Sequence, residues 1–265
     1  MKNILFAVIA GITLSAQGGL VHRYTFDNDV NDGVGTIDGA ATTNAANLEA
    51  PQYTNDVPGS TVTLAPTHSL EVGMSYGAKK SGVEVDSDVI SRNTGSYSLW
   101  FKADTLANAR YLIAALPLQD GPILIGKNSS QIKLSAGEEQ RAIPATVSIS
   151  TWHHVTATWD NPGGTYSFYL NGSLVGTTNC TPNSITPSWV RVGNYSLSDS
   201  TSNTNNQFEG HVYDLQFYDH ELASNEVTVL SANPGYALPP DPELMHRYRF
   251  EGNVDDSVGG VDGTA

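Results

Sequence analysis

Cysteine is nearly absent from this sequence: Cys180 is the only one in 265 residues. A single thiol cannot form a disulfide within the chain, so the fold has to be stabilised by a hydrophobic core. We interpret Cys180 as a small buried or loop residue. A lipid-modified cysteine after an export signal is also excluded, because no cysteine lies near the amino terminus.

Basic residues are scarce as well. The chain has 13 Lys and Arg against 27 Asp and Glu, which gives a formal net charge of -14 at pH 7. A chain this acidic repels nucleic acid and anionic lipid. We therefore expect neither nucleic acid nor a membrane surface as a partner.

Long apolar runs are missing outside the amino terminus. There, Lys2 precedes an apolar stretch from Ile4 to Ile12 and the small residues of Leu14-Ser15-Ala16, a pattern typical of an export signal. The apolar stretch is shorter than the roughly 18 residues that a membrane-spanning helix needs. We expect residues 1–16 to be a signal peptide, and the protein to be secreted or exposed at the cell surface without membrane insertion.

The sequence of residues 22–41 returns at residues 246–265, where 11 of 20 positions are identical: His, Arg, Tyr, Phe, Val, Asp, Val, Gly, Asp, Gly and Ala in order. The repeat begins 224 residues later, which is too long for a solenoid unit and fits a whole domain. We expect one domain at 19–235, a Pro-rich linker at 236–243, and the truncated start of a second repeat at 244–265.

Between residues 60 and 220 the chain has short runs of aromatic and β-branched residues separated by turn residues, which predicts strands. The runs are residues 97–101, 111–116, 123–125, 152–159 and 166–170. Turn sequences at 161–164 and at Asn171-Gly172 predict antiparallel hairpins.

One short helix is expected at residues 223–230. Ser224 is the candidate N-cap, Glu226 would lie in the first turn, and Pro234 would end the helix.

Several motifs occur in the order of a known family: Phe26-Asp27, Tyr97 to Phe101, Trp152 to Val155, Tyr169 to Gly172, Gly210 to Tyr218 and Leu222 to Val227. From about residue 19 to 234 the chain resembles the laminin G-like branch of the concanavalin A-like jelly rolls. The resemblance implies an all-β fold, a two-sheet antiparallel jelly-roll sandwich with one short C-terminal helix, as is common in secreted proteins that bind glycans or other surfaces. It does not imply an activity, because lectins, adhesion modules and glucanases share this fold.

The last long strand of this pattern contains an irregularity. Val212, Leu215 and Phe217 are the expected inward residues, but residues 212 and 215 are an odd number of positions apart. A β-bulge at Tyr213-Asp214 would restore the alternation and redirect the Asp214 side chain.

Hard oxygen ligands are concentrated after the first strand, at Asp27, Asp29, Asn31, Asp32 and Asp38. Calcium takes roughly 6–8 such oxygens, although Asp32 stands where an EF-hand loop needs Gly. The resemblance implies a structural calcium between the first strand region and an Asp of the last long strand, so the candidate ligands are Asp27, Asp32 and Asp214. The alternative is that Asp32 and Asp38 are turn residues whose carboxylates accept backbone N–H groups.

Glu84 and Asp88 lie in an alternating acidic segment that resembles the paired carboxylates of a glycoside hydrolase. However, the segment precedes the strand at 97–101, where the family has an ordinary outer strand, and we interpret it as a solvated acidic edge. We find no nucleophile elbow, zinc-protease helix or phosphate-binding glycine loop in the sequence.

A long polar stretch, Asn194 to Gln207, is the remaining candidate for ligand binding. Long loops on a rigid sandwich often carry binding sites, and aromatic faces stack on sugars. Trp189, Asn194 and Tyr195 are therefore the candidate ligand-binding residues, although a loop without a ligand is an alternative.

These observations predict a non-catalytic secreted module that binds a carbohydrate or another extracellular ligand, with calcium as a structural cofactor. The alternatives are a hydrolase that uses Glu84 and Asp88, and a structural spacer in a repeat array.

Overall fold

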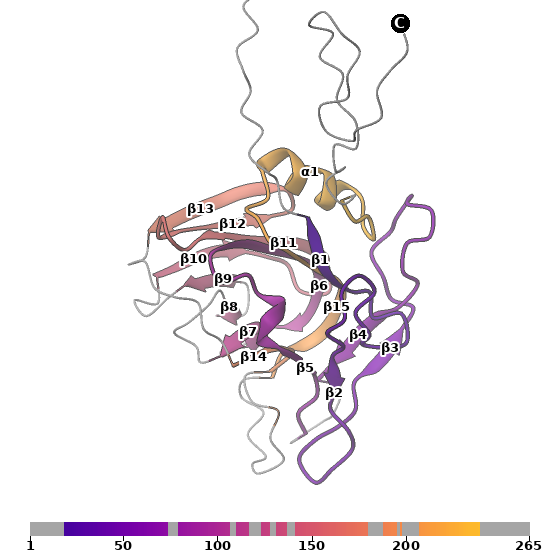
Figure 1. The fold of residues 1–265 in the computed structure, drawn as a ribbon. Coiled ribbons are helices and arrows are strands. Elements are labelled where there is room, and N and C mark those ends of the chain that lie inside the picture. The colour runs from indigo at the N-terminus through magenta and orange to yellow at the C-terminus, as the bar shows by residue number, and fades with distance from the viewer. Residues whose placement is uncertain are drawn as a thin grey trace, which may run out of the picture. The chain divides into compact units, whose positions relative to one another are not determined.

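In the residues that a computed structural model describes, the chain forms two antiparallel sheets that pack face to face around one core (Figure 1). The described residues are 19–73, 79–106, 110–116, 123–127, 131–136, 141–179, 188–194, 197 and 207–238. All of them belong to one compact unit, Gly19–Pro240. The predicted signal peptide, Cys180, Tyr195 and the repeat at 244–265 lie outside the described residues.

The larger sheet, here named the β15 sheet after one of its inner strands, has eight strands in the described residues. Their order is β13 (Ser173–Asn179), β12 (Thr165–Leu170), β11 (Trp152–Asp160), β6 (Thr94–Thr105), β15 (Glu209–Tyr218), β4 (Ser69–Val72) and β3 (Gln52–Thr54), and β1 (Leu20–Tyr24) also pairs with β15.

The smaller sheet, the β14 sheet, has seven strands in the same part of the chain. Their order is β10 (Arg141–Thr146), β9 (Gln131–Ala136), β8 (Ile123–Lys127), β7 (Arg110–Leu116), β14 (Trp189–Val192), β5 (Val83–Asp86) and β2 (Ala40–Ala41). The five predicted strands correspond to β6, β7, β8, β11 and β12, and the predicted two-sheet antiparallel sandwich is confirmed.

Strand alternation explains the core between the sheets. Tyr97, Leu99 and Phe101 of β6 are fully buried, as are Val190 and Val192 of β14, because every second side chain of a strand points to the same face. The intervening side chains point to the outer faces of the sheets, where those of Ser96 and Ser98 in β6 are still buried, whereas Trp189 of β14 is exposed.

The predicted turn after β12 is confirmed. Asn171 and Gly172 have φ values of 49° and 80°, the left-handed pair that a two-residue hairpin loop requires. The amide oxygen of Asn171 also accepts the backbone N–H of His154 at 2.9 Å, which fixes the turn to β11.

The predicted helix is α1 (Ser224–Ala232), and it ends before Pro234 as expected. The prediction that Ser224 is its N-cap is wrong, because Ala223 occupies the cap position with an extended ψ of 156°. Glu226 marks the difference: its Oε2 accepts the N–H of Ala223 at 2.7 Å, which is the contact that the third residue of a helix makes back to the cap residue in a capping box.

The predicted bulge in β15 is also confirmed. The register between β15 and β6 shifts between Tyr213 and Gln216, and Asp214 has a φ of 52°. Leu215 and Phe217 then return to the core side, while Asp214 is turned away from the regular alternation.

Candidate functional site

An exposed indole lies on the outer face of the β14 sheet. Trp189 begins β14, which is an inner strand between β7 and β5, and 46% of its surface is exposed. Since Val190 and Val192 point into the core, Trp189 and Arg191 belong to the outer face.

Arg191 is held in place beside this indole. It lies opposite Glu84 of β5, and its Nε donates to Glu84 Oε2 at 2.7 Å. We call Trp189, Arg191 and Glu84 the Trp189 face. An apolar ring next to a fixed ion pair offers both a stacking surface and charged hydrogen-bonding groups, which is the combination that a sugar ring with its hydroxyls can use. The sequence analysis missed Arg191, since only its cross-strand register connects it to Glu84.

The other predicted ligand-binding residues do not extend this face. Asn194 is buried, and its Nδ2 donates to Gln207 Oε1 at 2.9 Å. Gln207 in turn donates to the carbonyl of Gly193 at 2.9 Å. Asn194 therefore ties together the two ends of the long polar stretch, and the expectation that it faces a ligand is corrected; Tyr195 lies outside the described residues.

The acidic segment at residues 84–88 is not a sheet edge, contrary to our interpretation, because β5 lies between β14 and β2. Glu84 is bound to Arg191, whereas Asp88 belongs to the short 3-10 helix Ser87–Val89 and contacts Arg92 at 3.4 Å. The two carboxylates thus sit on different elements with different partners.

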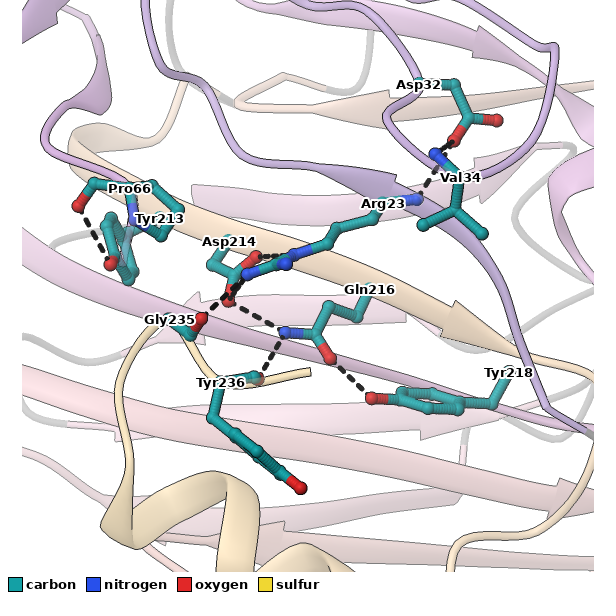
Figure 2. A network of polar contacts seen from close by, with 10 residues as sticks. All are labelled: Arg23, Asp32, Val34, Pro66, Tyr213, Asp214, Gln216, Tyr218, Gly235 and Tyr236. Atoms are coloured by element: carbon teal, nitrogen blue, oxygen red, sulfur yellow. Dashed lines mark hydrogen bonds and ion pairs between the residues drawn. The ribbon is translucent and has the colours of Figure 1, made fainter. Parts of the chain in front are cut away.

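Asp214 lies in a buried polar network at the bulge (Figure 2). Arg23 of β1 donates to both carboxylate oxygens of Asp214, from Nε at 2.7 Å and from Nη2 at 3.1 Å, and Gln216 Nε2 donates to Oδ2 at 2.7 Å. Burial raises the pKa of the Asp214 carboxyl, and the hydrogen bonds and charge of Arg23 oppose that shift. Three donors converge on one carboxylate, which leaves it well satisfied without a metal.

The same network fixes the segment after α1. Arg23 Nη2 donates to the carbonyl of Gly235 at 2.8 Å, and Gln216 Nε2 donates to that of Tyr236 at 2.9 Å (Figure 2). Tyr236 and Leu238 pack against the small apolar cluster under α1. Residues 236–238, which the sequence assigned to the linker, are therefore part of the sandwich.

Asp27 and Asp32 have other partners. His68 Nδ1 and Thr67 Oγ1 donate to Asp27 Oδ1 at 2.6 and 2.9 Å. The Asp32 carboxylate accepts from His22 Nδ1 at 2.5 Å and from the backbone N–H groups of Arg23, Val34, Gly35 and Ile37. Asp38 accepts the N–H of Asp32 at 2.9 Å, so the turn interpretation of Asp32 and Asp38 describes their contacts.

Asp27, Asp32 and Asp214 are therefore three separate hydrogen-bonding centres. Among the residues that the structure describes, no group of three or more His, Cys, Asp or Glu side chains could hold a metal ion. The calcium expected from the sequence stays a prediction.

A second polar cluster, which the sequence analysis missed, lies on the outer face of the β15 sheet. Asp56 forms an ion pair with Lys102 and accepts from Trp152 Nε1 at 3.2 Å. Lys102 Nζ lies 5.6 Å from the Trp152 ring centroid, and His211 Nε2 lies 3.8 Å from Asp56. These groups bind one another, so the cluster fastens the segment after β3 to the sheet.

Comparison with known proteins assigns the family. A family model described as the concanavalin A-like lectin/glucanases superfamily matches residues 77–228, more than half of the chain. The chain belongs to this superfamily. The Trp189 face lies within the matched segment of this superfamily domain. No curated protein matches the sequence significantly.

Solved structures of low sequence identity share the sandwich. Domain 4 of AbnA, a GH43 extracellular arabinanase from Geobacillus stearothermophilus, in complex with arabinotriose, is 19% identical with a TM-score of 0.58, over 81% of this chain and 99% of that one. A botulinum neurotoxin type C structure, described as dependent for cell entry on two ganglioside molecules, is 16% identical with a TM-score of 0.60, over 83% of this chain and 52% of that one.

A third similar structure is the binding domain of botulinum neurotoxin DC in complex with rat synaptotagmin II, 15% identical with a TM-score of 0.58, over 84% of this chain and 55% of that one. The chain thus spans nearly all of the arabinanase domain and about half of each of the two toxin chains. Within the described residues, α1 is too short to be a membrane-spanning helix.

Proposed function

We propose that this domain is a non-catalytic extracellular module that binds carbohydrate at the Trp189 face. The observation that carries the proposal is the half-exposed indole of Trp189 on an inner strand, beside the fixed Arg191–Glu84 pair. The exposed ring of a tryptophan can stack on the apolar face of a sugar.

The ion pair supports the same function. Because Glu84 accepts from the guanidinium of Arg191, these two charged side chains have fixed positions on the same outer face as the indole. Fixed groups lose little conformational entropy on binding. The arabinotriose and ganglioside named for two similar structures support carbohydrate as the ligand class.

The proposal of a non-catalytic role rests on the carboxylates. A glycoside hydrolase needs two carboxyl groups that face one bond, one of them able to give up a proton. Glu84 is committed to Arg191, and Asp88 is 70% exposed on a separate element beside Arg92. This arrangement supports binding over hydrolysis.

A binding assay with matched variants tests the proposal. The protein is titrated with arabinan, β-glucans and ganglioside micelles, and reducing ends are measured in the same samples. We expect Trp189→Ala to weaken binding about tenfold or more, since burial of a large apolar side chain under a ligand contributes about 1.5–3 kcal/mol and 1.4 kcal/mol is a factor of ten. Leu174→Ala, at a 53% exposed residue of β13 in the other sheet, is the control.

Three outcomes contradict the proposal. Equal losses in both variants would show a nonspecific effect, release of reducing ends would show hydrolysis, and absence of binding to every glycan would favour a protein ligand or a spacer. The Glu84→Gln variant separates carbohydrate binding from hydrolysis further. In a binding module it should lower the affinity for the glycan, whereas in a hydrolase it should lower the turnover.

A further inference from the structure

Asp56 and Lys102 come from separate elements and meet on the outer face of the β15 sheet. Asp56 follows β3, where its backbone N–H donates to Thr54 Oγ1 at 3.4 Å and its carbonyl oxygen accepts from Ser69 Oγ at 2.5 Å. Lys102 lies in β6, and its Nζ is in direct contact with Asp56 Oδ2. The contact joins residues that are 46 positions apart, and it spans β15, because β15 lies between β6 and β4.

The two side chains are flanked by aromatic rings. In the register of the sheet, Lys102 lies between Trp152 of β11 and His211 of β15. The Trp152 ring packs against His211 and Tyr213 at centroid distances of 6.0 and 6.2 Å. Only 14% of the Lys102 side chain is exposed, and 42% of that of Asp56. Partial exclusion of water weakens the hydration of the two charges and so favours a neutral product over the ion pair.

The two oxygens of the Asp56 carboxyl group have different neighbours. Lys102 Nζ contacts Oδ2, whereas Trp152 Nε1 donates to Oδ1 at 3.2 Å. His211 Nε2 lies 3.8 Å from Oδ2, and its Nδ1 lies 3.3 Å from Ser69 Oγ. Burial and the charge of Lys102 lower the pKa of His211, so its ring is neutral near pH 7 and able to accept a proton.

This arrangement contains more than an ion pair requires. An ion pair needs two opposite charges, whereas transfer of an acyl group to an amine needs three groups around the carboxyl carbon. A nucleophile has to touch the carboxyl group, a donor has to stabilise the oxyanion, and an acid–base group has to serve the leaving oxygen. These positions are occupied by Lys102, Trp152 and His211.

We propose that Lys102 and Asp56 form an isopeptide bond within the domain, an amide between Lys102 Nζ and Asp56 Cγ. A proton passes from the Lys102 ammonium to Asp56 Oδ2. The lone pair of the neutral amine then attacks Cγ, while one C–O electron pair moves onto Oδ1, where Trp152 Nε1 stabilises it. His211 takes a second proton from the nitrogen and gives it to Oδ2, which leaves as water when the carbonyl group at Oδ1 forms again.

The reaction is balanced without an oxidant or a reductant. One ammonium and one carboxylate become one amide and one water molecule. The bond ties the segment after β3 to β6 across β15. Because the chain has a single cysteine and therefore no disulfide within it, the amide gives the domain a covalent cross-link of another kind, one that reduction does not break.

Peptide mapping of the full chain tests the proposal. Cleavage after lysine and arginine separates Asp56 from Lys102 in an unmodified chain, because three such residues lie between them. In the cross-linked chain, residues 24–79 and 93–110 should appear as one branched peptide, lighter than the sum of the two by the mass of one water molecule. Separate linear peptides, with cleavage after Lys102, overturn the proposal.

Lys102→Arg is the matched variant, because arginine keeps the positive charge beside Asp56 but does not form this amide. We expect it to give no branched peptide and to melt about 10 °C below the parent, since a cross-link between residues this far apart restricts the unfolded chain as a disulfide does. If the parent and the variant both gave linear peptides and melted alike, the contact would be an ordinary ion pair.

His211→Gln tests the proton transfer. In protein sampled at a fixed early time after synthesis, the fraction with the branched peptide should fall about tenfold or more, because a positioned acid–base group accelerates proton transfer steps by about 10²–10⁴-fold. An unchanged fraction would overturn the role of His211. These measurements do not depend on carbohydrate binding.

Discussion

His154 is a buried histidine that the fold keeps neutral. Its Nε2 lies 2.7 Å from Ser98 Oγ, and burial lowers its pKa to about 3 from an ordinary value of 6.5. The unfolded chain therefore binds a proton between about pH 3 and 6.5 that the folded chain does not bind, so stability is complete above about pH 6.5 and falls on acidification.

We expect His154→Gln to reduce this loss of stability. Urea unfolding at pH 7 and pH 5 gives the difference, which should be smaller in the variant. Some pH dependence should remain, because burial also lowers the pKa of His153 and of His211. An identical difference in the parent and the variant would assign the pH dependence to other groups.

Asp32 is the opposite case, a carboxylate that the fold keeps charged. Burial tends to raise its pKa, but hydrogen bonds from His22 and from backbone N–H groups outweigh burial and hold the pKa below its ordinary value. Its contribution to stability is present above about pH 4 and is lost as the pH falls below that. We expect Asp32→Asn to destabilise the protein by about 2–3 kcal/mol at pH 7, because the amide has one acceptor oxygen instead of two and leaves part-buried N–H groups without acceptors.

The control for Asp32 is Asp38→Asn, which removes a single acceptor at an exposed position. It should have a much smaller effect in the same urea experiment. Equal effects would mean that the loop needs only negative charge and not the multiple hydrogen bonds of Asp32.

At the scale of elements, the Arg23–Asp214 pair joins β1 to the bulge of β15. Removing one partner of a buried ion pair costs about 3–5 kcal/mol, because the other charge is left unpaired. We expect Arg23→Met and Asp214→Asn each to destabilise strongly, and the double variant to cost clearly less than the sum. A double-mutant cycle in urea measures the coupling, and additive effects would show that the two side chains act independently.

The segment after α1 is a second element whose role can be tested by truncation. Residues 236–238 accept hydrogen bonds and pack on the sheet, so a chain that ends at Leu238 should melt like the full chain. A chain that ends at Pro234 loses the carbonyls that bind Arg23 and Gln216 and should melt at a lower temperature. Equal melting temperatures of the two truncated proteins would contradict this assignment.

The elements also show how far the sequence predicts this structure. The turn at Asn171-Gly172 and the bulge at Asp214 were predictable, because local backbone rules and alternation specify them. The Arg191–Glu84 and Arg23–Asp214 pairs were not, since each joins strands whose register only the folded sheet determines. The helix cap was misplaced by one residue because capping rules favour a hydroxyl such as that of Ser224, whereas the cap residue is Ala223, whose N–H is bound by Glu226.

At the scale of the whole molecule, the sequence predicts one calcium ion at Asp27, Asp32 and Asp214. An ion that binds only the folded state would stabilise it by about 2.7 kcal/mol at 100 times its dissociation constant. A chelator should then lower the melting temperature, and Asp27→Asn should abolish the response. An unchanged melting curve would assign the three carboxylates to the hydrogen bonds described above.

The position of β15 has a consequence for how the molecule forms. This strand lies between β6 and β4 and also pairs with β1, where Leu20 is aligned with Tyr218. The contact order is therefore high, because one sheet depends on contacts between the two ends of the domain. A growing chain cannot complete this sheet until β15 has been synthesised, and folding should be slow.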